Sequence, residues 1–171
     1  MSKFVSAFLY LLLLAACTNE AVVYSTYDSE TMGISFEYPE SWALDANALE
    51  VNVATDESLF AANTADFNNG AVVNISTVPI EAIGGDMVTA LNQFVGFLTS
   101  SEEAEQVGEM DTLVIQGHNA VQSTVNLAEN TTMIVTMIGG DAEVVLLAAV
   151  YDEAQYADLL QHVVQSVTFT E

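Results

Sequence analysis

The sequence predicts an α+β protein, a three-layer α/β/α sandwich with a mainly antiparallel central sheet. Its apolar residues follow a strand period over several short segments and a helical period over two longer ones, in the order strands, helix, strands, helix. The segments MIVTMI and VVLLAAV are almost continuously apolar, which is typical of central strands covered on both faces. One helix is available for each face of such a sheet.

The first predicted strand lies in ISFEY, where Ile34, Phe36 and Tyr38 alternate with polar residues. Pro39 ends this strand because proline cannot donate a hydrogen bond to a neighbouring strand. Trp42 follows, and its side chain has enough apolar area to cover one end of a core. The same strand period predicts further strands over residues 49–55, 58–62 and 71–78.

The middle of the chain changes to a helical period. Asp86 follows a Gly-Gly pair and is a suitable N-cap residue. The apolar residues after it that fall on one helical face are Met87, Leu91, Phe94, Val95 and Leu98. We therefore expect an amphipathic helix of about 14 residues, followed by a loop in the charged segment SSEEAEQVGEMD.

The rest of the chain returns to strands and ends in a second helix. Strands are predicted over residues 112–116, 119–127, 131–138 and 143–151. Gly139, Gly140 and Asp141 are expected to supply the positive φ angles of a tight hairpin between the last two strands. Asp152 and Gln155 have the spacing of a capping box. The apolar stripe of the final helix consists of Tyr156, Leu159, Leu160, Val163, Val164 and Val167.

The N-terminal apolar run, from Phe4 to Ala16, is shorter than the roughly 20 residues of a transmembrane helix. With Lys3 before it and small residues at its end, the run is typical of a secretory signal peptide. The order Leu14-Ala15-Ala16-Cys17 resembles the lipobox of bacterial lipoproteins. That resemblance implies cleavage before Cys17 and attachment of lipid, such as palmitate, to this residue. Plain secretion and a retained anchor are the alternatives.

The predicted organisation is a lipoprotein signal peptide over residues 1–16, a tether over 17–31 and one domain over 32–171. Cys17 is the single cysteine, so no disulfide can form within the chain.

The charge balance is strongly acidic. The chain has 24 Asp and Glu residues and one Lys or Arg, which is Lys3 in the predicted signal peptide. Nucleic acid and anionic lipid should repel the protein, because binding to either depends on basic side chains. Two interpretations stay open: a solubilising acidic surface, or a surface that recruits cations, weakly, or a basic partner.

No catalytic, cofactor-binding or metal-binding residues are predicted. His118 and His162 lack the HxxxH and HxH spacings of metal ligands, and His162 is expected to face solvent beside Asp158 and Gln165. The sequence has no GxSxG nucleophile motif, no P-loop and no DxDxDG calcium loop. Its acidic clusters are Asp56-Glu57, Glu102-Glu103-Glu105, Asp141-Glu143 and Asp152-Glu153.

Three segments, GISFEYPESW, VIQGHNAV and LLQHVVQSVTF, together resemble the PsbP-like superfamily over about residues 31–171. This superfamily includes the PsbP subunit of photosystem II and several bacterial lipoproteins. The resemblance implies an α/β/α sandwich and a binding or assembly role without catalysis. PsbP subunits dock through basic residues, however, and residues 17–171 contain no Lys or Arg.

These features predict a lipid-anchored, extracytoplasmic binding or assembly module of the bacterial cell envelope. Its expected partners are a membrane, through the lipid on Cys17, and an envelope protein, but not nucleic acid. The alternatives are an envelope hydrolase whose site forms only in three dimensions, and a lipoprotein that binds a small ligand or a cation.

Overall fold

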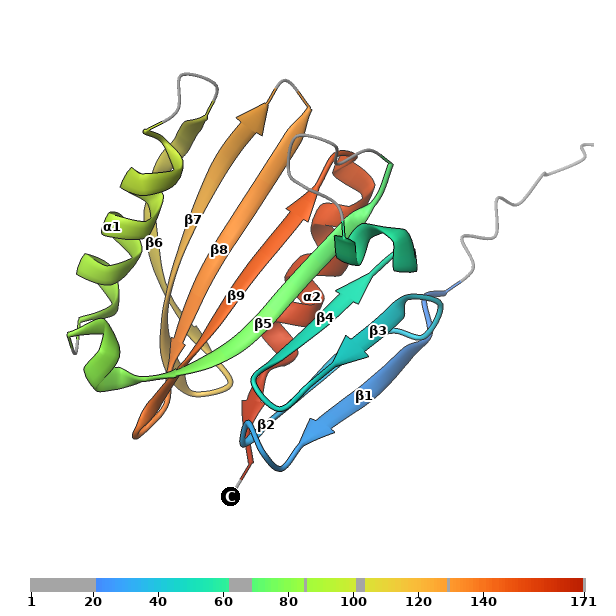
Figure 1. Cartoon of the computed structure of the whole chain (residues 1–171), viewed down its shortest axis with the longest axis horizontal. Helices are drawn as coiled ribbons and strands as arrows, with labels where there is room; N and C mark the ends of the chain where they lie inside the picture. Colours follow the sequence, from blue (N-terminus) through green and yellow to red (C-terminus); the bar gives the residue numbers. More distant parts are fainter. Residues whose placement is uncertain (1–20, 62–68, 85, 101–103, 129, 171) are drawn as a thin grey trace, which may run out of the picture.

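A computed structural model of the chain describes residues 21–61, 69–84, 86–100, 104–128 and 130–170 (Figure 1). The strands are β1 (Tyr24–Ser29), β2 (Ile34–Pro39), β3 (Ala43–Ala46), β4 (Glu50–Ala54), β5 (Ala71–Pro79), β6 (Glu105–Ile115), β7 (His118–Ala128), β8 (Thr131–Gly139), β9 (Glu143–Tyr151) and β10 (Thr168–Phe169). The α-helices are α1 (Met87–Leu98) and α2 (Ala157–Ser166). Short 3-10 helices are η1 (Glu57–Ala61), η3 (Ile80–Ile83) and η4 (Ala154–Tyr156).

The described strands form two antiparallel sheets. The large sheet has the order β3-β4-β5-β9-β8-β7-β6, and the small sheet has the order β1-β2-β10. Helix α1 lies on one face of the large sheet, while α2 and the small sheet pack on the other (Figure 1). The predicted α+β sandwich with a mainly antiparallel central sheet is therefore confirmed, and the almost continuously apolar strands β8 and β9 are central.

Two apolar layers hold these elements together. Between the large sheet and α2, the side chains of Phe36, Leu160 and Val163 are fully or almost fully buried. Trp42 is 9% exposed and meets the ring of Tyr156 edge-on, with the ring centroids 6.3 Å apart. This confirms that Trp42 closes one end of the core.

The layer under α1 is less complete. Leu91 and Val95 of α1 are buried against the sheet, and the helix makes its main contacts with β7 and β8. A helix about 10 Å wide cannot cover seven strands spaced about 4.8 Å apart. The prediction that the central strands are covered on both faces is therefore correct for β8 but incomplete for the α1 face of β9, where Leu146 and Ala148 are only half-buried.

Two predicted elements have a different structure. In the strand expected over residues 58–62, residues 58–61 belong to η1 instead, because the Asp56 carboxylate accepts hydrogen bonds from the backbone N–H and hydroxyl of Ser58 and so turns the chain. Within the charged loop expected over residues 100–111, residues 105–111 instead form the first part of β6. This edge strand tolerates polar residues, and its register shifts between Val107 and Asp111.

The N-terminal boundary also differs from the prediction. Part of the expected tether over residues 17–31 forms β1, which pairs with β2 along its whole length. Strand β1 has only one buried residue, Ser29, so no apolar alternation marks it in the sequence. Strand β3 was missed for the same reason, since it has no buried residue.

The predicted turn between β8 and β9 is present, but its backbone angles differ from the prediction. Gly139 and Gly140 lie at the turn from β8 to β9, but neither has a positive φ. A Cβ atom on Gly140 would lie 2.6 Å from Cε1 of Phe169, so close packing favours glycine there. The positive φ angles occur instead between β6 and β7, at Gln116 (48°) and Gly117 (88°).

The predicted capping box of the final helix is also wrong. Asp152 points back to the start of β5, where its carboxylate accepts hydrogen bonds from the backbone N–H groups of Asn69 and Gly70. The 3-10 turn η4 then leads into α2, and neither has a side-chain cap.

Among the described helices, none combines the length and the apolar character needed to cross a membrane.

Candidate functional site

The candidate site is the part of the large sheet that α1 leaves uncovered, which we call the open face. It consists of half-buried residues of two neighbouring strands: Val72, Asn74, Ser76 and Val78 of β5, and Leu146 and Ala148 of β9. Asn74 pairs with Ala148 and Ser76 pairs with Leu146, so these side chains project from the same face.

Helix α1 forms one wall of the open face. The Asp86 carboxylate caps this helix by accepting hydrogen bonds from the backbone N–H of Val88 at 3.0 Å and from the hydroxyl of Thr89 at 2.5 Å. The hydrogen bond from the Thr89 side chain is the main reason that the pKa of Asp86 lies below its ordinary value of 3.8. The predicted N-cap is thus confirmed, and the cap determines where the helix begins.

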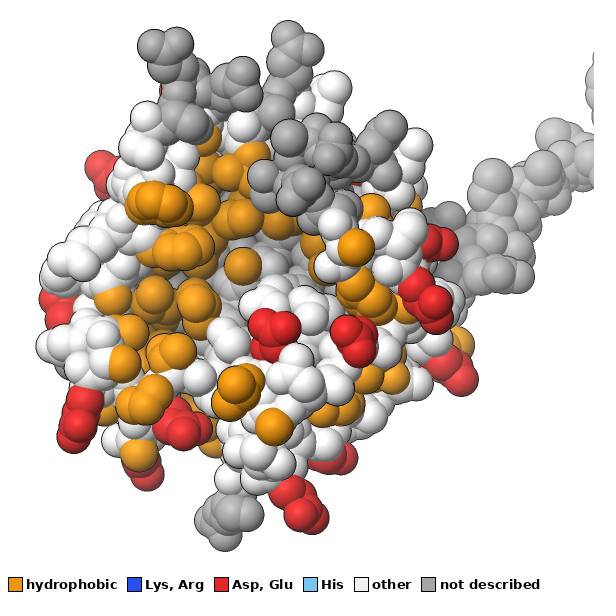
Figure 2. All heavy atoms as spheres, in the orientation of Figure 1, with side chains coloured by type: hydrophobic (Ala, Val, Ile, Leu, Met, Phe, Trp, Pro, Cys, Tyr) orange, Lys and Arg blue, Asp and Glu red, His pale blue; other side chains and the backbone are white. Residues whose placement is uncertain are grey.

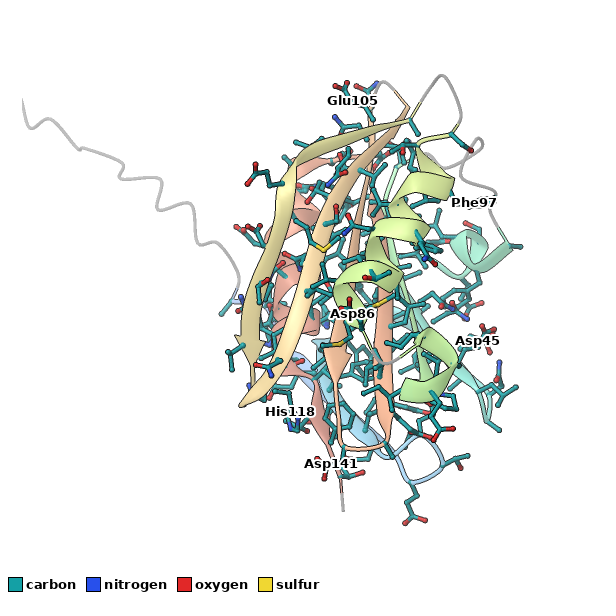
Figure 3. The ribbon with its side chains drawn as sticks, turned by 90° about the vertical axis from the view of Figure 1, so that its left-hand side faces the viewer. Asp45, Asp86, Phe97, Glu105, His118 and Asp141 are labelled. Carbon is teal, nitrogen blue, oxygen red and sulfur yellow. The ribbon has the colours of Figure 1, made fainter. Side chains whose placement is uncertain are left out.

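Two phenylalanines of α1 remain accessible to solvent. Phe94 is half-buried, and Phe97 is 74% exposed on the outer side of the helix (Figure 3). A side chain of this size loses much favourable apolar contact when it stands in water. The packing of α1 does not explain Phe97, because Leu91 and Val95 already attach the helix to the sheet.

A depression of about 780 Å³ lies where α1 begins. Its lining includes Ala90 and Phe94 of α1, Ile83 of η3 and Met137 of β8, with Asp86 at its border. Apolar side chains from three elements are therefore accessible within one hollow beside the open face.

The opposite border of the open face is polar and acidic. Asp45 of β3 pairs with Asn52 of β4, which pairs in turn with Asn74 of β5. The Asn74 amide donates hydrogen bonds to the side chains of Asn52 at 2.9 Å and Glu50 at 3.4 Å. Figure 2 shows the result as a hollow, mainly hydrophobic surface with acidic side chains along its border.

The predicted lipidation site, Cys17, lies outside the described residues, as does the predicted signal peptide over residues 1–16.

The sequence predicts that His162 faces solvent, but in the structure its side chain also contacts two other residues. Its Nε2 atom lies 2.9 Å from the Glu37 carboxylate, and its ring stacks on Tyr24 with the centroids 3.9 Å apart. The side chain of His162 is still 39% exposed. It borders a depression of about 430 Å³ that also includes Gln116 and Ser166 among its lining residues.

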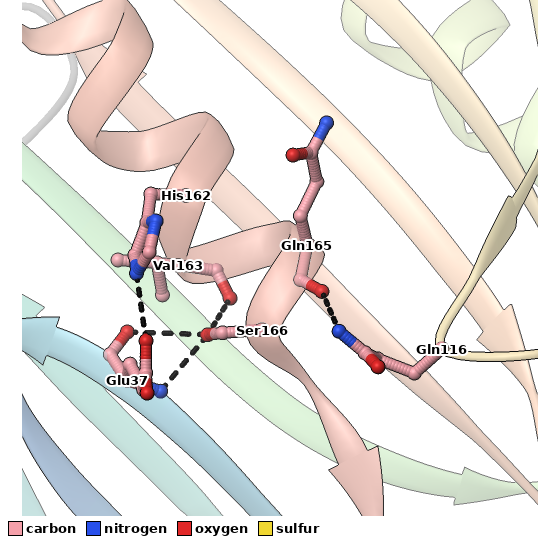
Figure 4. Close-up of polar contacts among 6 residues, drawn as sticks. All are labelled: Glu37, Gln116, His162, Val163, Gln165 and Ser166. Carbon is pink, nitrogen blue, oxygen red and sulfur yellow. Dashed lines mark hydrogen bonds and ion pairs between the residues drawn. The ribbon is translucent and has the colours of Figure 1, made fainter.

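Glu37, His162 and Ser166 include the residue types of a hydrolase triad, but their geometry is different. The Ser166 hydroxyl donates a hydrogen bond to the Val163 carbonyl at 2.8 Å and accepts one from the backbone N–H of Glu37 at 2.9 Å. A serine nucleophile needs a base within hydrogen-bond reach of its hydroxyl. Here the hydroxyl and the imidazole both contact Glu37, so they join α2 to β2 (Figure 4).

His118 is at the first position of β7 and has different contacts from His162. Its Nδ1 atom lies 3.1 Å from the Gly139 carbonyl, and its ring packs on Phe169 at a centroid distance of 4.6 Å. Together with His118, the side chains of Asp141 and Glu143 line a depression of about 490 Å³. Among the described residues, no group of three or more His, Cys, Asp or Glu side chains could hold a metal ion.

The acidic clusters belong to different elements of the fold. Asp56 belongs to the turn before η1, Asp152 binds the start of β5, and Glu105 lies at the start of β6. The hydrogen bond from the Ser58 side chain is the main cause that lowers the pKa of Asp56. Glu102 and Glu103 lie outside the described residues.

Three solved structures have this arrangement of sheet and helices over most of the chain. The Ran-binding protein Mog1p of Saccharomyces cerevisiae matches with a TM-score of 0.59 at 14% identity, over 88% of this chain and 97% of its own. Cyanobacterial PsbP (CyanoP) of Synechocystis matches with a TM-score of 0.58 at 14% identity, over 91% of this chain and 98% of its own. The chain has the PsbP-like fold.

LpqN of Mycobacterium tuberculosis, which is involved in cell envelope biogenesis, also matches this PsbP-like fold. Its TM-score is 0.55 at 16% identity, over 88% of this chain and 92% of its own. No protein-family profile and no curated protein sequence matches the chain. The likeness is therefore one of three-dimensional structure.

Sequence reasoning missed the open face of this PsbP-like fold. Phe97 lies outside the apolar stripe of α1, and a phenylalanine at such a position is a sign of a binding surface that the sequence does contain. Leu146 and Ala148 belong to β9, whose almost continuously apolar sequence predicts a strand buried on both faces. Only the position of α1 over β7 and β8 leaves them accessible.

Proposed function

We propose that the chain is a non-catalytic binding or assembly module, anchored by lipid on Cys17 to a bacterial membrane outside the cytoplasm, and that the open face receives its protein partner. The observation that carries this proposal is the apolar hollow between α1 and the polar border formed by Asp45 and Glu50. Soluble proteins rarely leave a contiguous apolar patch exposed unless it contacts another molecule.

Phe97 is the expected anchor of the interface. Aromatic side chains supply much of the binding energy of protein interfaces when a partner buries them. Phe97 is 74% exposed, and Phe94 lies three residues before it on the same helix. Burial of both rings by a partner would remove apolar surface that the folded domain alone leaves in water.

The structural neighbours support a binding role in general terms. Mog1p is a Ran-binding protein, and LpqN is involved in cell envelope biogenesis. The extracytoplasmic, lipid-anchored location is supported by the apolar run before Cys17 and by the lipobox-like order of residues 14–17.

Site-specific photo-crosslinking in native membranes tests this proposal. A photoreactive amino acid would replace Phe97, and in a matched control it would replace Val114, which is 67% exposed on β6 beyond α1. We expect the probe at position 97 to capture one defined protein, identified by mass spectrometry, and the probe at 114 to capture none of it. Equal capture at the two positions would contradict a partner at the open face.

Two further variants complete the experiment. The captured protein, purified with a tag, should retain the wild-type chain but lose Phe97→Gln, which keeps a good helix former at that position. Cys17→Ser should move the protein from the membrane fraction to the soluble fraction and abolish capture. Unchanged membrane association of this variant would rule out anchoring through Cys17.

A further inference from the structure

We propose that the partner places a cationic amphipathic helix on the open face, side by side with α1 and along β9 and β5. This inference rests on the proposed function and specifies the chemistry of the partner. Three independent features of the face support it: its width, its apolar floor and the charge of its far border.

The width of the open face matches one helix. Packed helices lie about 8–10 Å apart, and neighbouring strands lie about 4.8 Å apart. Helix α1 lies over β7 and β8, so the next helix position is two strands away, over β9 and β5 (Figure 1). The described residues provide no α-helix there, and only the short 3-10 helices η1 and η3 lie near the two ends of β5.

The floor of this position presents apolar side chains along β9 and toward the two ends of β5. Leu146 and Ala148 of β9 pair with Ser76 and Asn74 of β5, and Val78 and Val72 lie two positions farther along β5 on the same face. Ala148 has the smallest of these side chains and is central, so the backbone of an incoming helix could approach closely there. Phe94 of α1 forms the wall against which the same stripe would pack.

The charge of the far border determines which helix fits. Asp45 is exposed and Glu50 is half-buried on β3 and β4, and Asp86 lies at the near end of α1. Residues 17–171 contain no Lys or Arg that could neutralise them. Lysines or arginines along one side of a bound helix would lie opposite Asp45 and Glu50, which favours association.

The same charges disfavour two other occupants. A second copy of the chain would bring its own excess of acids, with a formal net charge of −23 for the whole sequence, and like charges at an interface are costly. An anionic lipid surface would be repelled for the same reason.

Peptide binding to the full-length lipidated protein tests the inference. The protein would be reconstituted in nanodiscs of zwitterionic phosphatidylcholine, with empty nanodiscs as the background. The first probe is a fluorescent Leu/Lys peptide of about 14 residues, or about 21 Å of helix, with one apolar stripe. A second peptide has Glu in place of Lys, and a third has the Leu/Lys residues scrambled to remove the stripe.

We expect measurable anisotropy-detected binding of the striped Leu/Lys peptide alone, and weakening of that binding as salt is added. A photoreactive version of the peptide should cross-link to α1, β5 or β9. Equal binding of the acidic or the scrambled peptide, or cross-links confined to other elements, would overturn the inference.

Two sets of variants separate charge from shape. Asp45→Asn with Glu50→Gln should weaken binding about tenfold, whereas Glu105→Gln with Glu109→Gln, which removes the same charge from β6, should change it less than about twofold. Ala148→Leu adds apolar surface but fills the centre of the floor. A tenfold loss on this substitution supports a seated helix, and a gain would indicate unspecific hydrophobic adhesion and overturn the proposal.

Further measurements distinguish two other molecules that could occupy the open face, a second copy of the chain and the chain's own residues 1–16. Self-association in analytical ultracentrifugation that Phe97→Gln abolishes would identify a second copy as the occupant and overturn the inference. Binding of a peptide of residues 1–16 in preference to the Leu/Lys peptide would do the same in favour of the chain's own apolar run. If the probe at position 97 captures a membrane protein but no cationic helix binds, the proposed function stands and this inference fails.

Discussion

The imidazole of His162 on α2 lies 2.9 Å from the carboxylate of Glu37 on β2 and at the same time stacks on the ring of Tyr24 on β1. One side chain thus joins a helix to two strands of the small sheet. The carboxylate of Glu37 and the imidazole of His162 are 49% and 39% exposed, and water at such exposed groups weakens the attraction between them.

We therefore expect the stacking of His162 to matter more than its ion pair. Glu37→Gln should lower the free energy of unfolding by less than about 1 kcal/mol. His162→Ala should lower it by about 1 kcal/mol more than His162→Phe, because phenylalanine retains a ring against Tyr24. Urea unfolding of the three variants measures these differences. A cost of Glu37→Gln equal to that of His162→Ala would show that the ion pair dominates.

Ser123 of β7 has a buried hydroxyl for which the described residues provide no hydrogen-bond partner. Its side chain is only 2% exposed, in the layer beneath α1. We expect Ser123→Ala to raise the free energy of unfolding by about 1 kcal/mol, since an unpaired buried hydroxyl is costly. The control is Thr136→Val, which removes a buried hydroxyl that accepts a hydrogen bond from Gln122 at 2.8 Å and should therefore destabilise. Stabilisation by both substitutions, or by neither, would contradict this prediction.

Asp86 should make the stability of α1 dependent on pH. Its pKa is lowered in the folded protein, so the folded state favours the ionised carboxylate. The stabilisation is fully present above the ordinary value of 3.8 and is lost as the pH falls through the lowered pKa. Asp86→Asn should keep the capping geometry but remove this part of the pH dependence. Thermal unfolding of both proteins from neutral pH to below 3.8 should show the midpoints converging, and parallel curves would exclude a role for this carboxylate.

Asp152 connects two segments that lie 82 residues apart, through its hydrogen bonds to the backbone of Asn69 and Gly70. Two backbone N–H donors that lose their carboxylate acceptor should cost about 2 kcal/mol or more, so Asp152→Ala should be clearly destabilising. Glu153→Ala, at the next position, should change the free energy of unfolding by less than about 0.5 kcal/mol, because its side chain is exposed. Equal effects in chemical denaturation would show that the contact at Asn69 and Gly70 contributes little.

The elements that the sequence predicted correctly are those with locally complete signals. Helix α1 has a cap at Asp86 and an apolar stripe, and both lie within the helix itself. Strands β8 and β9 are apolar throughout because the sheet buries them at its centre. Strands β1 and β6 lie at sheet edges in contact with water, so their composition resembles that of a loop.

The candidate site could not be predicted in this way, because its features depend on distant parts of the chain. His162 has its ion-pair partner 125 residues away, at Glu37. The accessibility of Leu146 depends on which strands α1 covers, and no local pattern in the sequence records that choice. The sequence shows that residues 17–171 contain no Lys or Arg, but it does not show that acidic side chains border an apolar hollow.

Strand β2 pairs with β1 on one edge and with β10 on the other, and the partners Ser35 and Thr168 are 133 residues apart. During synthesis, the ribosome releases β2 long before the strand that protects its second edge. An unprotected strand edge can pair with other chains, and contacts between residues so far apart form slowly. Through most of its translation a nascent chain of this kind would therefore have an unprotected strand edge, and the small sheet can be completed only after Thr168 and Phe169 have been synthesised.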